Sequence, residues 1–291
     1  MIDAHFHIWR QADLPWLTGP MVPRIFGPYQ PLRRDYTMSE YLRDIDGQGV
    51  TEAVYVQANW APEEAEAEVA WVEGVANATG WPHAIVGFAD LTLADARPAL
   101  DRLARHPRMR GIRQQLHWHQ NPAWRFAARP ELARDATLQR NVAQLADYDW
   151  VFELQVFDTQ IPGACELIDA CPQVTFVLVH AGMLNDLSGA GRDRWRRHLA
   201  DLARRPNVVA KVSGFGTFLR RNDPEHVGWM ISETVLAFGA GRCLFGSNFP
   251  IEKLWTSYAG LIDAFRRGAG GLAEGERVAL FETTARRVYR L

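Results

Sequence analysis

The sequence predicts an α/β protein in which 291 residues form one closed barrel of alternating strands and helices. Three observations lead to this fold class. Short apolar runs rich in β-branched residues recur eight times, segments of helical periodicity separate most of them, and no linker or repeat divides the chain. Parallel strands that are joined by right-handed crossovers close into a barrel after eight such units, so we expect a single (β/α)8 TIM barrel.

The eight apolar runs are the predicted strands. They cover Ile2–Ile8, Ala53–Gln57, Ala84–Ala89, Gly111–Leu116, Val151–Phe157, Val174–His180, Val208–Ser213 and Cys243–Gly246. The predicted helices between them are Met38–Gln48, Pro62–Ala78, Ala96–Arg105, Leu138–Tyr148, Pro162–Ala170 and Arg192–Arg204, and the chain is expected to end in a further helix. Thr37 and Glu40 have the spacing of a capping box, which places the start of the first long helix.

Two long loops interrupt the alternation, one after the first strand (Arg10–Tyr36) and one after the fourth (His117–Arg134). The first contains five prolines and several aromatic residues. Loops of this length in a compact domain are usually lids or binding loops, with simple packing as the alternative. The aromatic side chains that could wall a pocket above the barrel are Trp16, Phe26, Tyr29, Trp118 and Trp124.

Charge and cysteine content exclude several functional classes. The 32 basic and 34 acidic residues give a net charge of −2 without a basic patch, which argues against a nucleic-acid partner. The three cysteines have no CxxC or His-Cys spacing, so we expect them to be buried and reduced rather than paired or bound to zinc. No leader and no membrane-length apolar run is evident, so the cytoplasm is the expected compartment. The expected partner is a small-molecule substrate, and a homo-oligomer is left open.

Polar residues occur near the end of most predicted strands. In the first strand, Asp3, His5 and His7 are expected to share one face, while the apolar residues between them fill the other. Two imidazoles two residues apart on a strand can both reach one metal ion or one ligand. Because chemistry in a barrel gathers where the strands end, this pair predicts an active site there.

The later strands add polar side chains at the same end. Strand four offers Arg113 and Gln115, strand five offers Glu153 and Gln155, and strand seven offers Lys211 and Ser213. Strand six ends in a lone histidine, and strand eight leads to an asparagine. A core built only for stability would use Val, Ile and Leu at these positions. The predicted active site therefore comprises His5, His7, Arg113, Gln155, His180, Lys211 and Asn248, with Gln57 and His117 as further substrate contacts.

Five motifs resemble the amidohydrolase superfamily, and within it the amidohydrolase 2 group of predicted metal-dependent TIM-barrel hydrolases. They are Asp3–Trp9 (DAHFHIW), Arg110–Arg113 (RGIR), Val177–Gly182 (VLVHAG), Lys211–Gly214 (KVSG) and Phe245–Pro250 (FGSNFP). The resemblance extends in order from residue 3 to about residue 255. The group includes lactonases of sugar acids, sulfomuconolactone hydrolase and pyrone-dicarboxylate lactonase, so the resemblance implies a hydrolase of lactones or similar cyclic esters.

The resemblance also implies roles for individual residues. His5, His7 and His180 match the positions that hold one divalent metal ion, zinc or manganese, or the substrate carbonyl in members that lack metal. The position that matches Asn248 is usually an aspartate that takes a proton from the attacking water. An amide has no useful basicity, so the general base must lie elsewhere. A binuclear metal centre is not expected, and a metal-free site is an open alternative.

Three functional hypotheses follow. In the first, the protein hydrolyses a lactone of a small sugar acid or aromatic-degradation intermediate, and His180, another histidine or Glu252 takes the proton. Arg113 and Lys211 would then bind carboxylate or hydroxyl groups of the substrate. In the second, it is a lyase or isomerase that uses histidine acid–base chemistry on a similar acid. In the third, the barrel has lost its chemistry and binds a ligand.

Overall fold

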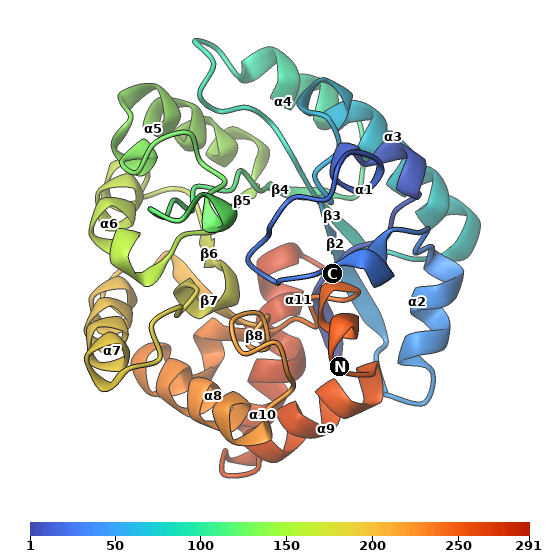
Figure 1. Ribbon diagram of the computed structural model, residues 1–291. Coiled ribbons are helices and arrows are strands. Elements are labelled where there is room, and N and C mark those ends of the chain that lie inside the picture. Colours follow the sequence, from blue (N-terminus) through green and yellow to red (C-terminus); the bar gives the residue numbers. More distant parts are fainter.

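A computed structural model describes all residues, 1–291, and its centre is one eight-stranded barrel (Figure 1). The strands follow one another around it in chain order, each parallel to the next. They are β1 (Ile2–Phe6), β2 (Glu52–Val56), β3 (Ala84–Gly87), β4 (Met109–Ile112), β5 (Val151–Leu154), β6 (Phe176–Leu178), β7 (Val208–Val212) and β8 (Cys243–Phe245). The His7 amide donates to the Phe249 carbonyl at 2.8 Å, and the Asn248 amide donates to the His5 carbonyl at 2.7 Å. These bonds join the last strand to the first, and the predicted (β/α)8 barrel is confirmed.

Eleven helices surround the barrel, and most of them form a ring outside the strands, whereas the last one lies across one end (Figure 1). They are α1 (Pro15–Thr18), α2 (Met38–Ile45), α3 (Ala65–Thr79), α4 (Arg97–Leu103), α5 (Ala136–Ala143), α6 (Ile161–Ala170), α7 (Gly189–Ala203), α8 (Pro224–Phe238), α9 (Tyr258–Gly268), α10 (Glu274–Val278) and α11 (Thr284–Tyr289). The predicted capping box at Thr37 is wrong. Its hydroxyl lies 3.0 Å from Ser39 Oγ, and Glu40 instead pairs with Arg34 and Lys253, because charge-assisted contacts are stronger than a neutral cap.

Two apolar layers hold the barrel together. The outer layer lies between strands and helices, and alternate residues such as Phe152, Leu154 and Phe176 point into it. The inner layer fills the barrel mostly with alanine and β-branched side chains, among them Val54, Val86 and Val177. Helix α11 packs against this inner layer and closes the end where the strands begin. The opposite end is left for polar side chains.

A β-bulge in β1 corrects one sequence expectation. Ile2 and Asp3 pair with Glu52 and Ala53, but Phe6 then pairs with Tyr55, so β1 contains one extra residue. Asp3 therefore does not share a face with the two histidines of β1. It points outward and accepts hydrogen bonds from the hydroxyls of Tyr41 at 2.9 Å and Tyr258 at 3.0 Å.

The two long loops have short helical turns of their own and cross the end of the barrel where the strands finish (Figure 1). In the first loop, Trp16 and Phe26 line the central pocket, while Tyr29 is buried beneath them. In the second, Trp124 lines an adjoining pocket and Trp118 a separate, more polar one. The three cysteines are buried and unpaired, as predicted. None of the helices combines the length and apolar character needed to cross a membrane.

Candidate active site

The two imidazoles of the β1 end form the floor of the site. His7 Nδ1 lies 2.6 Å from the carbonyl oxygen of Val56, and because a carbonyl only accepts, this nitrogen carries the proton. Nε2 of neutral His7 is thereby left as an acceptor. His5 lies deeper, with its ring centroid 5.0 Å from that of His7, and its Nε2 atom is buried without a partner. The bulge in β1 brings both rings to the inside of the barrel.

His180 and Asn248 approach the floor from the other side of the barrel. His180 lies just beyond β6, in a tight turn rather than in the strand as predicted, and its φ is +53°. Asn248 follows β8 with φ of +57°. Left-handed backbone is rare outside glycine and often marks a functional site. His180 Nδ1 lies 2.7 Å from Ser213 Oγ, which fixes the plane of the ring, and the His180 and His5 rings are 4.9 Å apart.

Burial and two cations keep these imidazoles neutral. Desolvation, with the charge of Arg113 acting in the same direction, lowers the pKa of His7 to about 3. Desolvation also holds the pKa of His5 and of His180 well below the usual value, with Lys211 and Arg113 adding to the effect. At neutral pH each ring is therefore uncharged and can accept a hydrogen bond.

Arg113 supplies a buried positive charge without an ion pair. Its Nη2 donates to the Gln57 carbonyl, its Nη1 lies 3.4 Å from Gln155 Oε1, and its Nε has no partner. Burial lowers the pKa of the guanidinium to about 10, so it stays charged at neutral pH. Because Gln155 accepts through its oxygen, its amide nitrogen is free to donate into the pocket.

Lys211 lies beneath this floor. It is fully buried, its Nζ lies 2.5 Å from Glu153 Oε1, and the same oxygen accepts the hydroxyl of Tyr289 from α11. Desolvation lowers the pKa of Lys211, while Glu153 opposes this shift. The nitrogen also lies 3.5 Å from His5 Nδ1. Lys211 thus acts on the pocket through His5 and does not line it.

Glu252 is the carboxylate nearest to Asn248. Its Oε1 lies 3.4 Å from Asn248 Nδ2, and its Oε2 accepts from Trp255 Nε1 at 2.7 Å. Burial raises the pKa of Glu252 to about 7, against the lowering effect of these hydrogen bonds. An ionised Glu252 accepts from the Asn248 amide group and turns its oxygen toward the pocket. A protonated Glu252 can donate to that oxygen instead, which turns the amide around.

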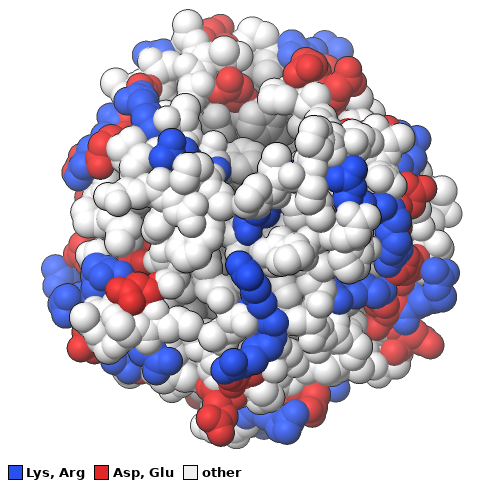
Figure 2. Space-filling view, viewed as in Figure 1, with Lys and Arg blue, Asp and Glu red and all other residues white.

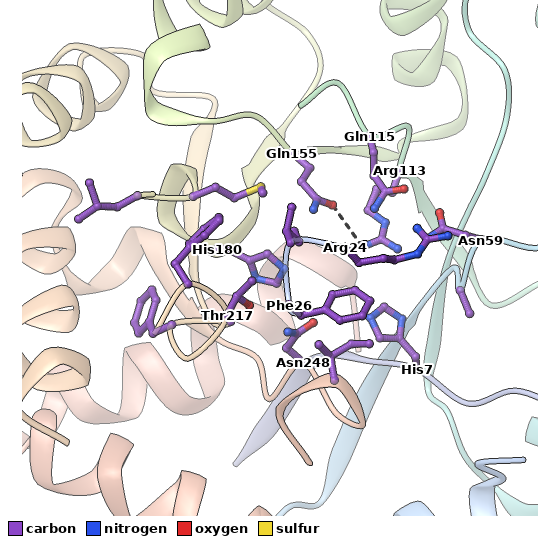
Figure 3. A pocket seen from close by; sticks show the side chains of 18 of the residues that line it. His7, Arg24, Phe26, Asn59, Arg113, Gln115, Gln155, His180, Thr217 and Asn248 are labelled. Carbon is purple, nitrogen blue, oxygen red and sulfur yellow. Dashed lines mark hydrogen bonds between the residues drawn. The ribbon is translucent and has the colours of Figure 1, made fainter. Parts of the chain in front are cut away.

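One pocket unites these groups, and its empty space, including the part open to solvent, is about 820 Å³ (Figure 3). Five of the predicted residues line it: His7, Arg113, Gln155, His180 and Asn248. His5 and Lys211 are buried below, and Gln57 and His117 line neighbouring pockets. The residues that the prediction missed are Arg24, Asn59, Thr217 and His226, all on loops or at a helix start. The length of the first loop was a signal for Arg24 alone, and no sequence signal pointed to the other three.

The donor set does not fit a metal ion. No group of three His, Cys, Asp or Glu side chains is arranged to hold one. The Lys211 ammonium beside His5 and the Arg113 guanidinium on the pocket wall place positive charge close to the imidazoles that would hold a metal ion. The position after β8 carries an amide rather than a carboxylate, which is a poorer ligand. The chemistry below is therefore derived from the side chains alone.

Comparisons with known proteins agree with the fold and the motifs. The sequence model of the family described as Amidohydrolase matches residues 2–291. An uncharacterised protein of Sinorhizobium fredii is 33% identical and covers 100% of this chain and 98% of its own. The L-fucono-1,5-lactonase of Burkholderia multivorans is 32% identical over 100% of this chain and 96% of its own. A crystal structure of an amidohydrolase from Burkholderia multivorans with bound zinc superimposes with a TM-score of 0.83, at 30% identity over 100% of this chain and 99% of the other. The chain belongs to the amidohydrolase family.

Proposed function

We propose that the protein hydrolyses a lactone of a small hydroxylated acid to the open-chain hydroxy acid. One observation carries the proposal: a neutral imidazole, His180, faces the same pocket as the unpaired Arg113 guanidinium and the Gln155 amide. This is a proton acceptor opposite hydrogen-bond donors, which is the arrangement that acyl transfer to water requires. The similarity to an enzyme named L-fucono-1,5-lactonase supports the same reaction class.

The side chains divide the reaction between them. Arg113 and Gln155 donate to the lactone carbonyl oxygen and stabilise the charge that develops on it. In the tautomer that donates from Nδ1 to Ser213 Oγ, His180 takes a proton from the attacking water at Nε2. The negative charge of the tetrahedral intermediate favours the protonated ring. When the bond to the ring oxygen breaks, His180 returns the proton to that oxygen and the product is a hydroxy acid.

The experiment is a screen of purified protein against sugar-acid and aromatic-derived lactones with a pH indicator. Each turnover releases one proton at neutral pH, because the product carboxylic acid ionises. We expect rates well above the spontaneous opening of at least one lactone. A clean screen without proton release would contradict hydrolysis, and solvent deuterium entering a substrate without ring opening would favour the isomerase alternative.

The pH dependence of the reaction is expected to report Glu252. Because its pKa is about 7, the Asn248 oxygen faces the pocket only above that pH, where it can accept a hydrogen bond from the attacking water and orient it, so kcat/KM is expected to fall as the pH drops through 7. Glu252→Gln still accepts from Asn248 but does not titrate, so the acidic limb should disappear. The measurement is kcat/KM from pH 5.5 to 9 for both proteins. An unchanged acidic limb in the variant would assign it to another group.

We further propose that the reaction proceeds without a divalent metal. The support is the donor set, in which two cations and an amide occupy the surroundings of the three imidazoles. Protein purified without chelator is expected to contain zinc and manganese far below one ion per chain by elemental analysis. Full activity after extended treatment with a chelator is the second expectation. Loss of activity that only zinc or manganese restores would show that the imidazoles hold a metal.

A further inference from the structure

The charges that line the pocket are all positive. Twenty-two residues line the pocket. Arg24 and Arg113 are among them, and none is Asp or Glu. Neither guanidinium takes part in any of the ion pairs of the molecule. Figure 2 shows basic side chains at the centre of this face and acidic ones toward its periphery. The pocket is therefore a positively charged hollow in a protein whose net charge is −2.

Arg24 is held in place by aromatic rings instead of by a carboxylate. Its guanidinium carbon lies 5.2 Å from the ring centroid of Trp16 and 6.0 Å from that of Tyr29. Its Nε atom is buried without a hydrogen-bond partner. Cation–π contacts orient the group but leave its N–H donors free. Figure 3 shows Arg24 extending along the same side of the pocket as Arg113, opposite His180.

A third cation supports the turn that carries Arg24. The Gly27 amide donates to the Arg24 carbonyl at 2.9 Å, and Gly27 has φ of +79°. A Cβ at residue 27 would lie 2.8 Å from Nε of Arg220, so the Arg220 side chain packs directly on this turn. The loop from β1 and the loop after β7 thus place positive charge at one part of the rim.

A bound ligand without charge would leave these guanidinium groups desolvated and unpaired, which is costly. A ligand that carries a carboxylate removes that cost, and a guanidinium binds a carboxylate through two parallel hydrogen bonds. We propose that the substrate is a lactone that bears a free carboxylate, and that Arg24 is the residue that recognises it. This inference rests on the proposed lactone hydrolysis and names the substrate class. Arg113 keeps its proposed role as a hydrogen-bond donor to the lactone carbonyl oxygen.

The test compares lactones that share a ring and differ in one group. Glucaro-1,4-lactone carries a carboxylate where glucono-1,4-lactone carries a hydroxymethyl group, and the galactaro and galactono lactones form a second pair. We expect a higher kcat/KM for the acidic member of at least one pair. Arg24→Gln should raise KM for that member by roughly 10- to 100-fold and for its neutral partner by a much smaller factor. Arg24→Lys, which keeps the charge but loses the bidentate contact, should lie between.

Arg10→Gln is the matched control, because Arg10 lies on the same loop, is exposed, pairs with Asp13 and does not line the pocket. It should leave the preference for the acidic lactone intact. A loss of the same size for both members of a pair in Arg24→Gln, or a higher kcat/KM for the neutral member of each pair, would overturn the proposal.

Binding measured without turnover separates this proposal from the proposed function. In the His180→Asn background, calorimetry should give a lower Kd for the acidic lactone than for its neutral partner, and adding Arg24→Gln should remove the difference. Equal Kd values would refute carboxylate recognition even if lactones are hydrolysed. A lower Kd for the acidic lactone, together with no hydrolysis by the unmodified protein, would refute the hydrolase function but still support carboxylate recognition.

Discussion

His180→Asn is expected to lower kcat/KM for lactone hydrolysis by roughly 10²- to 10⁴-fold, the range that a positioned acid–base group contributes. The loss should fall on kcat more than on KM, because the imidazole moves the proton while Arg113 and Gln155 hold the carbonyl. The fold should survive. His180 has φ of +53°, and asparagine tolerates that backbone conformation better than most residues do. The measurement is steady-state proton release, with circular dichroism to confirm folding.

His106→Asn is the control for the loss of any histidine, since His106 lies on the loop after α4 and outside the pocket. It should retain full activity. Ser213→Ala tests the orientation of the ring: it removes the contact at 2.7 Å but keeps the imidazole, so we expect a smaller loss. Activity of His180→Asn within a few-fold of the unmodified protein would exclude this residue as the proton acceptor.

Lys211→Met is expected to destabilise the protein by about 3–5 kcal/mol, the usual cost of removing one partner of a buried ion pair. The substitution leaves the fully buried Glu153 carboxylate with the Tyr289 hydroxyl alone. The free energy of unfolding in urea is the quantity to compare. Lys211→Met combined with Glu153→Gln should recover most of the loss, because the amide oxygen still accepts from Tyr289 and no unpaired charge remains.

The chain supplies its own control in Lys253, its only other lysine. The Lys253 Nζ pairs with Glu40 at 2.8 Å and Asp44 at 2.7 Å, but its side chain is 29% exposed. Solvent weakens such pairs, so Lys253→Met should cost about 1 kcal/mol or less. Equal losses in the free energy of unfolding for the two lysine variants would mean that burial does not make the Lys211–Glu153 pair more important for stability than the partly exposed pairs of Lys253.

The barrel could be predicted from the sequence because each strand has a recognisable pattern within its own few residues. Runs such as Ala84–Gly87 and Val208–Val212 are mostly apolar and rich in β-branched residues, and residues two apart along a strand share a face. The same alternation of faces correctly predicted that Arg113 and Gln155 line one pocket. It failed at Asp3, because a β-bulge depends on the pairing of two strands and leaves no local signal.

The rest of the site depends on contacts between distant segments. The sequence suggested a substrate ligand at Lys211, whereas the structure pairs it with Glu153, 58 residues away, and sets both under the floor. Arg24 is one of many arginines, and only the path of the loop after β1 brings it to the pocket. Loop paths are set by tertiary packing rather than by local propensity, so periodicity carries no information about them.

The left-handed backbone at Asn248 has an evolutionary consequence. Asparagine and aspartate are nearly identical in shape, and both adopt this conformation more readily than other side chains. Asn248→Asp would thus exchange an amide for a carboxylate next to the histidine cluster while the turn after β8 stays as it is. A single nucleotide change makes that exchange. A lineage could therefore move between the two kinds of site while the barrel stays folded, which is how one scaffold comes to host several chemistries.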